Sequence, residues 1–575
     1  MPYADSARPR GEVVADTFGA LVRLFFSRFF DKESLSPQGD AEANVFQTLG
    51  ILAAPGGLIS LILYFNPQIK VGWSLVSARC LFLSASMAII AFIVVFEWDA
   101  LFLDRRDYQV LLPLPLPLWK LFLAKMTAFI LFLGLFLAAI NIFATLLWPS
   151  VFDNGNYFAV MGTHLTVVIG AGLFSALAAA CIQGLLLALV PERIFRVVAT
   201  SSQTILMSGL VMLFFLCPLF AGGIQMLVQA HSGVERYIPA YWFTGLYERL
   251  RPATGDSALL NLGKMALPGL SWVLAIFALT HLPGYRRQAR KLIEAPPSNP
   301  AGPGRLRVAL NTAVDRVLLK DPVQQGVYHF IGQTISRSMK HRLFLAVYAG
   351  FGAALVVFGI DQNGGEGLLS LLIRGQRFVP DPIGLLRIPF TLSFILITGL
   401  RAAFSFPAEL TANWAFQISD ANQTRQCMIA MRKWIVVCGV VPLFLLLVPL
   451  ELAFFSWAVV LIQTVFGLTV SILLVEVMFF DFRKIPFTCG YFPERNNLVW
   501  LIATYVAGLV LYSSKMADIE IWLIWEPQYI VVFVLAAACV WLAVWKWHGR
   551  AKSQTGLDYL GDPDPMIRTL ELTPH

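Results

Sequence analysis

The chain has 575 residues, of which 43 are Lys or Arg and 35 are Asp or Glu, so that only 14% are charged; soluble proteins average about 25%. Hydrophobic residues make up 57% of the sequence, and the mean hydropathy is +0.69. So few charges cannot cover the surfaces of soluble domains, which excludes a disordered chain, a secreted disulfide scaffold and an ordinary cytosolic enzyme. The composition therefore predicts a polytopic membrane protein.

The first predicted element is an amphipathic helix over Phe18–Phe30, within an N-terminal segment that lacks the short apolar core and cleavage site of a signal peptide. Its sequence, FGALVRLFFSRFF, holds Arg on one side. We expect this helix to lie in the membrane interface, with its aromatic rings inserted and its Arg residues toward lipid phosphates.

Twelve mostly apolar segments follow, each near the roughly 20 residues that a spanning helix needs. In chain order they are Thr48–Phe65, Ala78–Phe96, Leu121–Leu147, Phe158–Val190, Gln203–Val228, Met265–His281, Leu343–Ile360, Ile388–Phe404, Trp434–Leu452, Trp457–Phe480, Leu498–Ser513 and Tyr529–Trp547. The predicted fold is an all-α polytopic membrane protein with about twelve transmembrane helices, arranged as two six-helix repeats.

An even number of spans places both termini on the same side of the membrane. If that side is the cytoplasm, the inward segments hold about three times as many Lys and Arg residues as the outward ones, as the positive-inside rule requires. The net charge of +8 is then explained by cytoplasmic loops beside membrane lipids, without a nucleic-acid partner. We expect a multi-pass protein of the plasma (inner) membrane with cytoplasmic termini.

A polar segment divides the spans into two sets of six. Pro, Gly and charged residues concentrate there, which predicts a cytoplasmic linker that ends in a second interfacial helix over Val327–Arg342. The predicted organisation is a cytoplasmic N-terminus, a first six-helix unit, a linker, a second six-helix unit and a cytoplasmic tail: residues 1–47, 48–281, 282–342, 343–547 and 548–575.

The two halves are predicted to be repeats of one architecture. Each half begins with an amphipathic helix, followed by two spans and a polar loop. A third span follows, and it starts near a lysine. Lys125 and Lys433 lie nearly as far apart in the chain as Arg28 and Arg337, which favours a parallel duplication. Residue identity between the halves is weak, and the hydropathy blocks of any polytopic protein would resemble such a repeat.

The sequence carries no motif for nucleotide, metal or catalysis. It lacks a G-x-x-x-x-G-K-[ST] loop, an H-E-x-x-H motif and a Cys/His cluster, and its seven Cys residues form no C-x-x-C pair. We find no Asp or Glu near the predicted midplanes, because Glu451 and Glu476 lie near span ends, which disfavours an ion-coupled carrier. The amides of Asn141, Gln183, Gln203 and Gln463 are interpreted as interhelical hydrogen-bonding groups, and the small residues of Gly170–Gly184 as packing contacts.

The loop Glu97–Lys125 has two parts. Charged residues surround apolar ones in its first part, which predicts a short amphipathic helix resting on the bundle. Pro113, Pro115 and Pro117 then alternate with Leu, which favours a stiff, extended connector. A helix joined to a stiff connector transmits force between spans and suits docking to a cytoplasmic motor. The alternative is a solvated loop whose prolines end a helix.

This loop resembles the one between the second and third spans of ABC-2 type exporter permeases, which also runs from an acidic and basic helix through a Leu-Pro pattern to a Lys. In the second half, PAELTANWAF (Pro407–Phe416) and KIPFTCGYFP (Lys484–Pro493) are similar to segments of large bacterial permeases of that class. The segment IPAYWFTGLYE (Ile238–Glu248) is similar to the one before their sixth span. The order of helices and loops resembles that of this class over most of the chain.

The resemblance implies an interfacial elbow helix before each six-span unit. It also implies coupling helices that sit in grooves on two separately encoded ATP-binding subunits, so that ATP is bound by the partner and no cofactor by this chain. The residues implied to couple to the ATPase are Glu97, Asp104, Arg105, Arg106, Asp107, Tyr108, Glu409, Asn413, Trp414 and Gln417. Most simple members have one six-span unit and dimerise, whereas two units are fused here, and the second loop lacks the first loop's DRRD cluster and Leu-Pro run.

The sequence thus predicts the permease subunit of an ATP-driven ABC exporter, which is not itself an enzyme and forms the translocation pathway. Two alternatives stay open. One is a membrane-embedded enzyme or scaffold that acts on lipid, and the other is an ion-coupled carrier.

Overall fold

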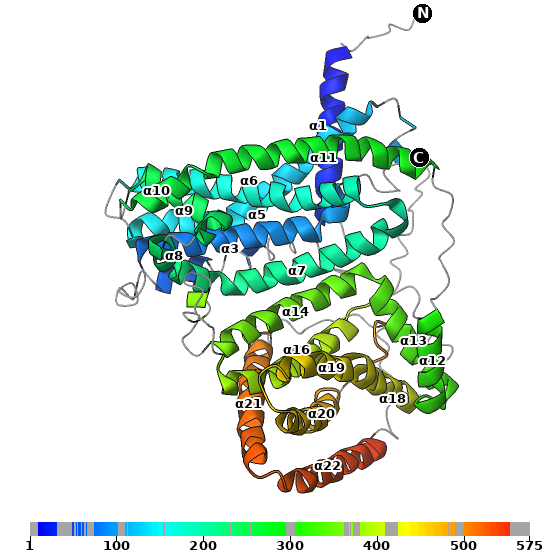
Figure 1. Cartoon of the computed structure of the whole chain (residues 1–575). Helices are drawn as coiled ribbons and strands as arrows, with labels where there is room; N and C mark the ends of the chain where they lie inside the picture. The colour runs from blue at the N-terminus through cyan, green and yellow to red at the C-terminus, as the bar shows by residue number, and fades with distance from the viewer. Residues whose placement is uncertain are drawn as a thin grey trace, which may run out of the picture. The chain divides into compact units, whose positions relative to one another are not determined.

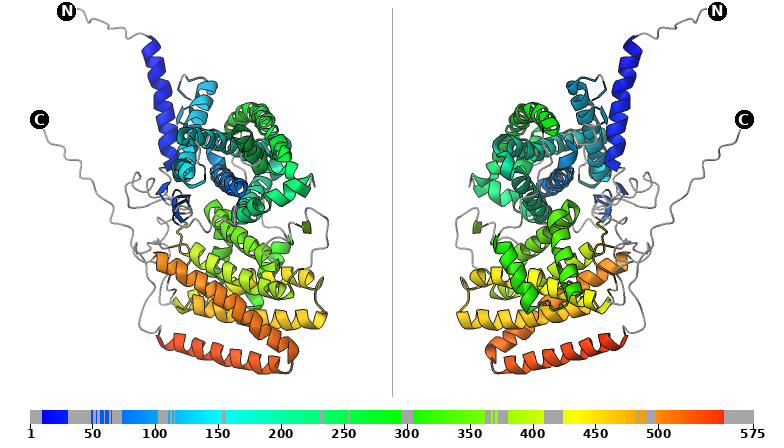
Figure 2. Two further views of the ribbon diagram at one scale, coloured as in Figure 1. Left: turned by 90° about the vertical axis from the view of Figure 1, so that its left-hand side faces the viewer. Right: turned by 90° about the vertical axis from the view of Figure 1, so that its right-hand side faces the viewer.

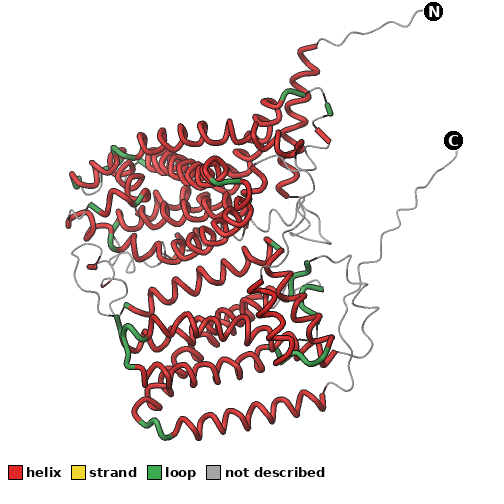
Figure 3. Tube along the Cα trace, turned by 45° about the vertical axis from the view of Figure 1, so that its right-hand side comes forward, coloured by secondary structure: helices red, strands yellow, loops and turns green. Residues whose placement is uncertain are grey.

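The computed structural model describes most of the chain. The described residues are 10–30, 74–101, 110–152, 156–252, 255–294, 305–361, 380–408, 424–488 and 498–551, apart from residues 112, 115, 231–232, 481 and 483, together with scattered residues within 49–65 and 367–371. They form helices and the turns between them, and no strand occurs in this described part (Figure 3). The described part of the protein is therefore all-α, as predicted.

Nine helices in the described part are long and apolar enough to cross a membrane. They are Leu75–Phe96, Trp119–Leu147, Tyr157–Leu189, Val197–Gly222, Ser257–His281, Met339–Ile360, Pro382–Phe404, Arg425–Glu451 and Trp457–Met478. Of the twelve predicted spans, Thr48–Phe65 is described only in part, and the last two lie in helices that are not among these nine. The structure supports a multi-pass membrane protein.

The chain divides into two compact units. Unit 1 comprises Met1–Asn299 and Gly365–Phe378, and unit 2 comprises Pro300–Gly364 and Val379–His575. The main boundary, at Asn299, falls inside the predicted linker.

Unit 1 is built around one helix. Its elements are α1 (Arg10–Phe30), α3 (Leu75–Phe96), η2 (Trp98–Leu101), α5 (Leu118–Phe152), α6 (Tyr157–Leu189), α7 (Glu192–Gly222), α8 (Ile224–Ala230), η3 (Val234–Tyr237), α9 (Pro239–Leu250), α10 (Ser257–Gly263) and α11 (Ala266–Glu294). Helix α3 packs against α5, α6, α7 and α9, and it is the most buried candidate span of this unit (Figures 1 and 2). Helix α1 packs on α5, and α11 on α6.

Unit 2 is also built around one helix. Its elements are α12 (Arg305–Val317), α13 (Pro322–Arg337), α14 (Met339–Ile360), α16 (Pro382–Phe404), α18 (Thr424–Trp434), the π-helical turn η5 (Ile435–Val440), α19 (Val441–Glu451), α20 (Trp457–Met478), α21 (Leu498–Trp525) and α22 (Tyr529–Ala551). Helix α16 packs against α14, α20, α21 and the η5–α19 segment, and it is the most buried candidate span here. Helix α13 packs on α18, and α22 on α20 (Figure 1).

Short polar residues begin several of these helices by accepting a hydrogen bond from an otherwise unpaired backbone N–H. The side chain of Asn156 accepts from Phe158 N at 3.1 Å, and that of Ser74 from Ser77 N at 3.0 Å. Asp321 and Asp381 cap α13 and α16, and each is followed by a proline, which tolerates the first helical position because its missing N–H would be unpaired there.

Small residues let the helices of unit 1 approach closely, as predicted for Gly170–Gly184. A Cβ atom at Gly172 would lie 2.7 Å from Leu137 of α5, and one at Gly184 would lie 2.6 Å from Thr280 of α11. The closest approach joins α9 to α10, where a Cβ atom at Gly245 would lie 2.4 Å from the carbonyl oxygen of Leu259. Only glycine fits at such a backbone contact.

Several predicted boundaries were wrong. The predicted span Gln203–Val228 is broken, because α7 begins at Glu192 and ends at Gly222, and α8 follows. The predicted interfacial helix Val327–Arg342 is also two helices, since Ser338 is extended and separates α13 from α14. Helix α21 continues to Trp525 instead of ending at Ser513, so Glu520 is helical.

Candidate functional site

The amphipathic helix α13 packs on the first turns of the third long helix of unit 2. The apolar residues of this contact are spaced three or four positions apart on each helix, as on one helical face. On α13 they are Val327, Tyr328 and Ile331, and on α18 they are Cys427, Met428, Met431 and Trp434, all of which belong to one buried cluster. We call the end of each unit at which its amphipathic helix lies the proximal end, and the other the distal end.

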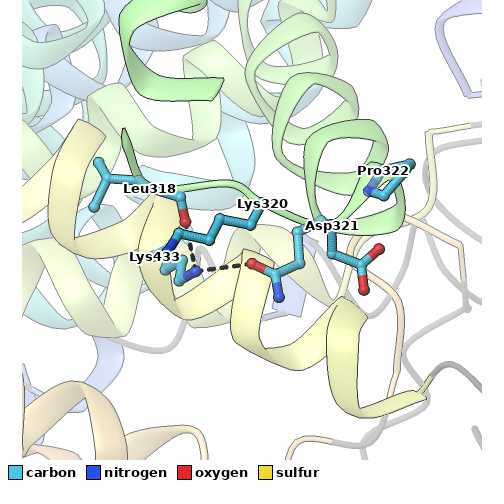
Figure 4. A pocket seen from close by; sticks show the side chains of 6 residues that line it. Leu318, Lys320, Asp321, Pro322 and Lys433 are labelled. Carbon is cyan, nitrogen blue, oxygen red and sulfur yellow. Dashed lines mark hydrogen bonds between the residues drawn. The ribbon is translucent and has the colours of Figure 1, made fainter. Parts of the chain in front are cut away.

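Lys433 connects α13 to α18 through hydrogen bonds. Its Nζ donates to the carbonyl oxygen of Leu318 at 2.7 Å and to Oε1 of Gln324 at 2.8 Å (Figure 4). Gln324 Nε2 in turn donates to Oε1 of Gln426 at 2.5 Å. These groups border an open cavity of 530 Å³ that is lined by Leu318, Lys320, Asp321, Pro322, Gln324 and Lys433.

A tyrosine adds a second connection in the same contact. The Tyr328 hydroxyl lies 3.1 Å from Sγ of Cys438, in the π-helical turn. Burial raises the pKa of the Tyr328 phenol, with its hydrogen bond to Cys438 as a further cause, so this group stays protonated and able to donate. The contact between α13 and the third long helix is therefore both apolar and hydrogen-bonded.

Basic groups join three further helix ends at the proximal end of unit 2. Arg432 of α18 forms an ion pair with Glu476 of α20, with 2.5 Å between Nη1 and Oε2, and both side chains are mostly buried. Arg401 of α16 donates to the carbonyl oxygen of Met478. Helices α16, α18 and α20 are thus cross-linked where they end, and a buried pair of this kind is costly to break.

The loop after α20 crosses the end of α16. Phe487 has a φ angle of 67°, which costs a bulky residue about 1–2 kcal/mol. Its backbone N donates to the carbonyl oxygen of Phe404 at 3.0 Å, and its own carbonyl accepts from Ala408 N at 2.9 Å. Its ring packs edge-on against those of Phe404 and His341. The chain leaving α16 is therefore fixed up to Ala408, where the predicted second coupling loop begins.

Unit 1 has a related contact at its proximal end. Nζ of Lys125, on α5, lies 5.4 Å from the ring centroid of Phe25, on α1, a cation–π contact. Phe29 of α1 stacks on Phe132 of α5 with 4.7 Å between ring centroids. The amphipathic helix α1 of this unit is thus also fixed to the first half of the long helix α5.

Two amides hold the end of α3, from which the predicted first coupling loop departs. Gln203 Nε2 donates to the carbonyl oxygen of Val95, and Gln183 Nε2 to that of Trp98, both at 2.7 Å. Carbonyl groups at a helix end lack intrahelical partners, so these bonds stabilise that end. The prediction that amides inside the spans link helices is confirmed for these two and for Asn141 of α5, whose Nδ2 donates to Oγ of Ser86 in α3 at 2.9 Å. It is wrong for Gln463, whose amide has no hydrogen-bond partner among the described residues. Glu97, which follows α3, is 5% exposed.

The other predicted coupling residues lie outside the described part of the structure. These are Asp104, Arg105, Arg106, Asp107, Tyr108, Glu409, Asn413, Trp414 and Gln417. Of the predicted set, only Glu97 is described. The described residues do bring Lys125 and Lys433 into contact with the amphipathic helix of their own unit.

Sequence reasoning missed two buried sets of charged residues. In unit 1, Arg79 of α3 and Glu248 of α9 form an ion pair at 3.0 Å, with side chains 2% and 1% exposed. In unit 2, Glu451 and Glu520 are buried near the distal end. A single charge within an otherwise apolar stretch was the available signal at Arg79 and Glu451, whereas Glu248 and Glu520 have other charged residues close to them in the sequence.

Comparison of the chain with protein-family models, with curated proteins and with solved structures finds no match.

Proposed function

We propose that this chain is the membrane-spanning subunit of an ATP-driven exporter of the ABC-2 permease type. In this proposal, separate ATPase subunits dock on the loops at the proximal ends, which face the cytoplasm. The observation that carries it is the same contact in both units: an amphipathic helix fixed to the first half of the third span, beside the end of the second span.

The matching packing within the two units supports an architectural repeat. In each unit the second span is central, the fifth long helix packs on it, and the sixth packs on the fourth: α7 and α21 on α3 and α16, and α11 and α22 on α6 and α20. Two fused six-helix units in one chain would form the whole translocation pathway, in a plasma membrane with both termini in the cytoplasm.

The cross-linked proximal end of unit 2 suits force transmission. A push on the loop after Ala408 would reach α16 directly, α20 through Arg401 and α18 through Arg432 and Glu476. Lys433 would pass it on from α18 to α13. Because these helix ends are held together, they would move as one body when ATP closes the partner ATPases. Directional export further requires that the cargo bind the two states of the pathway with different affinities.

Co-purification tests the proposal. The tagged chain should recover a partner that contains a P-loop, and the complex, but not the isolated chain, should hydrolyse ATP. The double substitution Arg105→Glu and Arg106→Glu should lower partner recovery by roughly tenfold or more, because it replaces attraction by repulsion at the docking loop. Lys264→Glu, a charge reversal at an exposed residue of the opposite predicted side, is the matched control and should change nothing.

Unchanged partner recovery and unchanged ATP-dependent transport in the Arg105 and Arg106 variant would contradict the proposed docking loop. ATP hydrolysis by the isolated chain would contradict the proposal that a separate subunit binds and hydrolyses ATP.

An ion-coupled carrier is the second candidate, because a specific observation favours it. Glu520 is a fully buried carboxyl group inside a long helix, and such groups are typical of proton relays in transporters. Transport by vesicles that contain the purified chain alone, driven by an ion gradient without ATP, would support this candidate over the exporter.

A further inference from the structure

Two acidic side chains lie buried in unit 2 on two helices that both pack against α16. Glu451 is the last residue of α19 and is 7% exposed, whereas Glu520, five residues before the end of α21, is 0% exposed. The two carboxyl groups are close enough to interact electrostatically. They therefore form a pair at the distal end of the unit.

The surroundings of the pair are apolar. Ala517 and Leu523, on either side of Glu520 in α21, belong to a buried cluster with Phe390, Phe466 and Val470. No described residue forms a hydrogen bond with either carboxyl oxygen of Glu520, or with Oε1 of Glu451. An ionised carboxylate without such bonds is costly in an apolar environment, so the neutral acid is favoured.

The polar side chains described near this cluster do not alter the preference for the neutral acid. Gln463, which is fully buried between the cluster residues Ile462 and Phe466, has no described hydrogen-bond partner for its amide and is suited to bond a protonated carboxyl group. It carries no charge that could balance an ionised acid.

Two further acids lie at this end of the helices around the pair: Asp361, which is buried after α14, and Asp381, which caps α16. The other charged groups on these helices are engaged or exposed elsewhere. Arg387 lies on an exposed position of α16, Lys515 pairs with Asp518 on the exposed side of α21, and Glu526 at the end of α21 is exposed. On the other packed helices, Arg432 pairs with Glu476 and Arg401 bonds to Met478, both at the proximal end. No base in the described part forms an ion pair with Glu451 or Glu520.

The space beside Glu451 limits what the pair can bind. The adjoining cavity measures about 10 Å³ and is otherwise lined by apolar groups: Leu385, Ile388, Leu447, Leu450, Phe454 and Phe455. That volume is at the lower limit for a single water molecule, so an organic cation does not fit. The described residues also hold no group of three or more His, Cys, Asp or Glu side chains that could bind a metal ion.

We propose that Glu451 and Glu520 form a proton-binding pair that holds at least one proton while the distal end of unit 2 is packed. Glu520 is fully enclosed in an apolar cluster without a hydrogen bond to either carboxyl oxygen, so its neutral form is favoured, and a negative charge on Glu451 would favour it further. Opening of α19 and α21 to water would release the proton. Because the packed state binds more protons, low pH favours that state, and rising pH favours opening. This inference does not depend on ATP or on a partner subunit.

Labelling with dicyclohexylcarbodiimide tests the proton directly, because this apolar reagent attacks protonated carboxyl groups in apolar surroundings. Mass spectrometry of the full chain in detergent should find the adduct on Glu451 or Glu520 at neutral pH, with less adduct as the pH rises. Glu520→Gln should remove the adduct from position 520, whereas the control Glu526→Gln should leave labelling unchanged. Absence of an adduct at both positions in the folded protein, or labelling that does not change with pH, would overturn the proposal.

A second measurement separates a proton site from a cation site. Glu520→Gln, which mimics the protonated acid, should retain the neutral-pH Tm and flatten the fall of Tm toward alkaline pH. An unchanged slope of Tm against pH would contradict the proposal. Protection of both glutamates from labelling by Na⁺, at constant pH, would also overturn it by assigning the pair to a metal cation.

Discussion

Two buried ion pairs in the described part join neighbouring helices, and the Arg79–Glu248 pair in unit 1 is the more enclosed of them. Arg79 Nη1 also donates to the carbonyl oxygen of Arg251 at 3.2 Å, and its guanidinium lies 4.2 Å from the ring centroid of Tyr247. Glu248 Oε1 accepts from Gly255 N at 3.2 Å. The pair therefore fixes α9 and the turn after it to the first turn of α3.

Glu248→Gln should destabilise unit 1 by about 3–5 kcal/mol, because it leaves the Arg79 charge buried without its counter-charge. The measurement is the Tm of the purified chain in detergent, followed by tryptophan fluorescence. The double substitution Arg79→Leu and Glu248→Leu should recover part of the loss, since no charge then remains buried. A single variant as stable as the exposed control Asp518→Asn would contradict this assignment.

The sequence predicted residue roles where the chemistry allowed one interpretation. An uncharged amide inside a span is stabilised by an interhelical hydrogen bond, so the bonds of Gln183 and Gln203 were foreseeable, whereas the absence of a described partner for Gln463 was not. Arg79 was not, because a base at the start of a predicted span is equally compatible with a position in the lipid headgroups. Its partner, Glu248, is 169 residues away along the chain, and only the tertiary fold brings the two together.

Among the elements, the contact of α9 with α10 depends on two glycines. A Cβ atom at Gly263 would lie 2.5 Å from the carbonyl carbon of Gly245, so the two backbones touch. Gly245→Ala should therefore separate the helices and cost roughly 1–3 kcal/mol, as overpacking does. Thermal unfolding in detergent measures this loss.

The control for this substitution is Gly209→Ala, in the middle of α7. A Cβ atom there would meet nothing within 4 Å, so alanine should be neutral or stabilise the helix by up to about 1 kcal/mol. Equal Tm values for the two variants would show that α9 and α10 do not touch as described.

Helix ends were predictable from sequence only where the cap is local. Asp321 before Pro322 and Asp381 before Pro382 are recognisable starts, whereas the break at Ser338 is not, since the apolar pattern continues across it. The end of α21 was misplaced for another reason. Hydropathy falls after Ser513 because of Lys515 and Asp518, but these residues lie on the exposed side of a helix that continues to Trp525.

For the whole molecule, the distribution of Lys and Arg predicts which face of the membrane each loop occupies. Lys320, before α13, should be cytoplasmic, and Lys264, before α11, should be outside. Both side chains are exposed. An impermeant maleimide applied to intact cells should label Lys264→Cys, and should label Lys320→Cys only after permeabilisation, each compared with the unsubstituted chain. The reverse pattern would invert the topology and remove the basis for cytoplasmic docking.

Composition alone was sufficient to predict an all-α membrane protein, because burial in lipid leaves few other folds for such a chain. The main boundary between the two compact units falls within the Pro- and Gly-rich linker segment. The candidate site was predicted only in outline. Lys125 and Lys433 were singled out as equivalent positions, but their contacts with Phe25 and Gln324 depend on how amphipathic helices pack, which periodicity does not specify.

The π-helical turn at Ile435–Val440 places one more residue between α18 and α19 than a regular α-helix would need there. A π turn arises when one extra residue is accommodated without rotating the helix on either side. Loss of Val437 would rewind the turn to regular geometry and leave Lys433 and Glu451 on their present faces. In the uninterrupted helix α5, the same loss would rotate everything beyond it by about 100°. The α18–η5–α19 segment should therefore tolerate the deletion of one residue in its middle, whereas α5 should not.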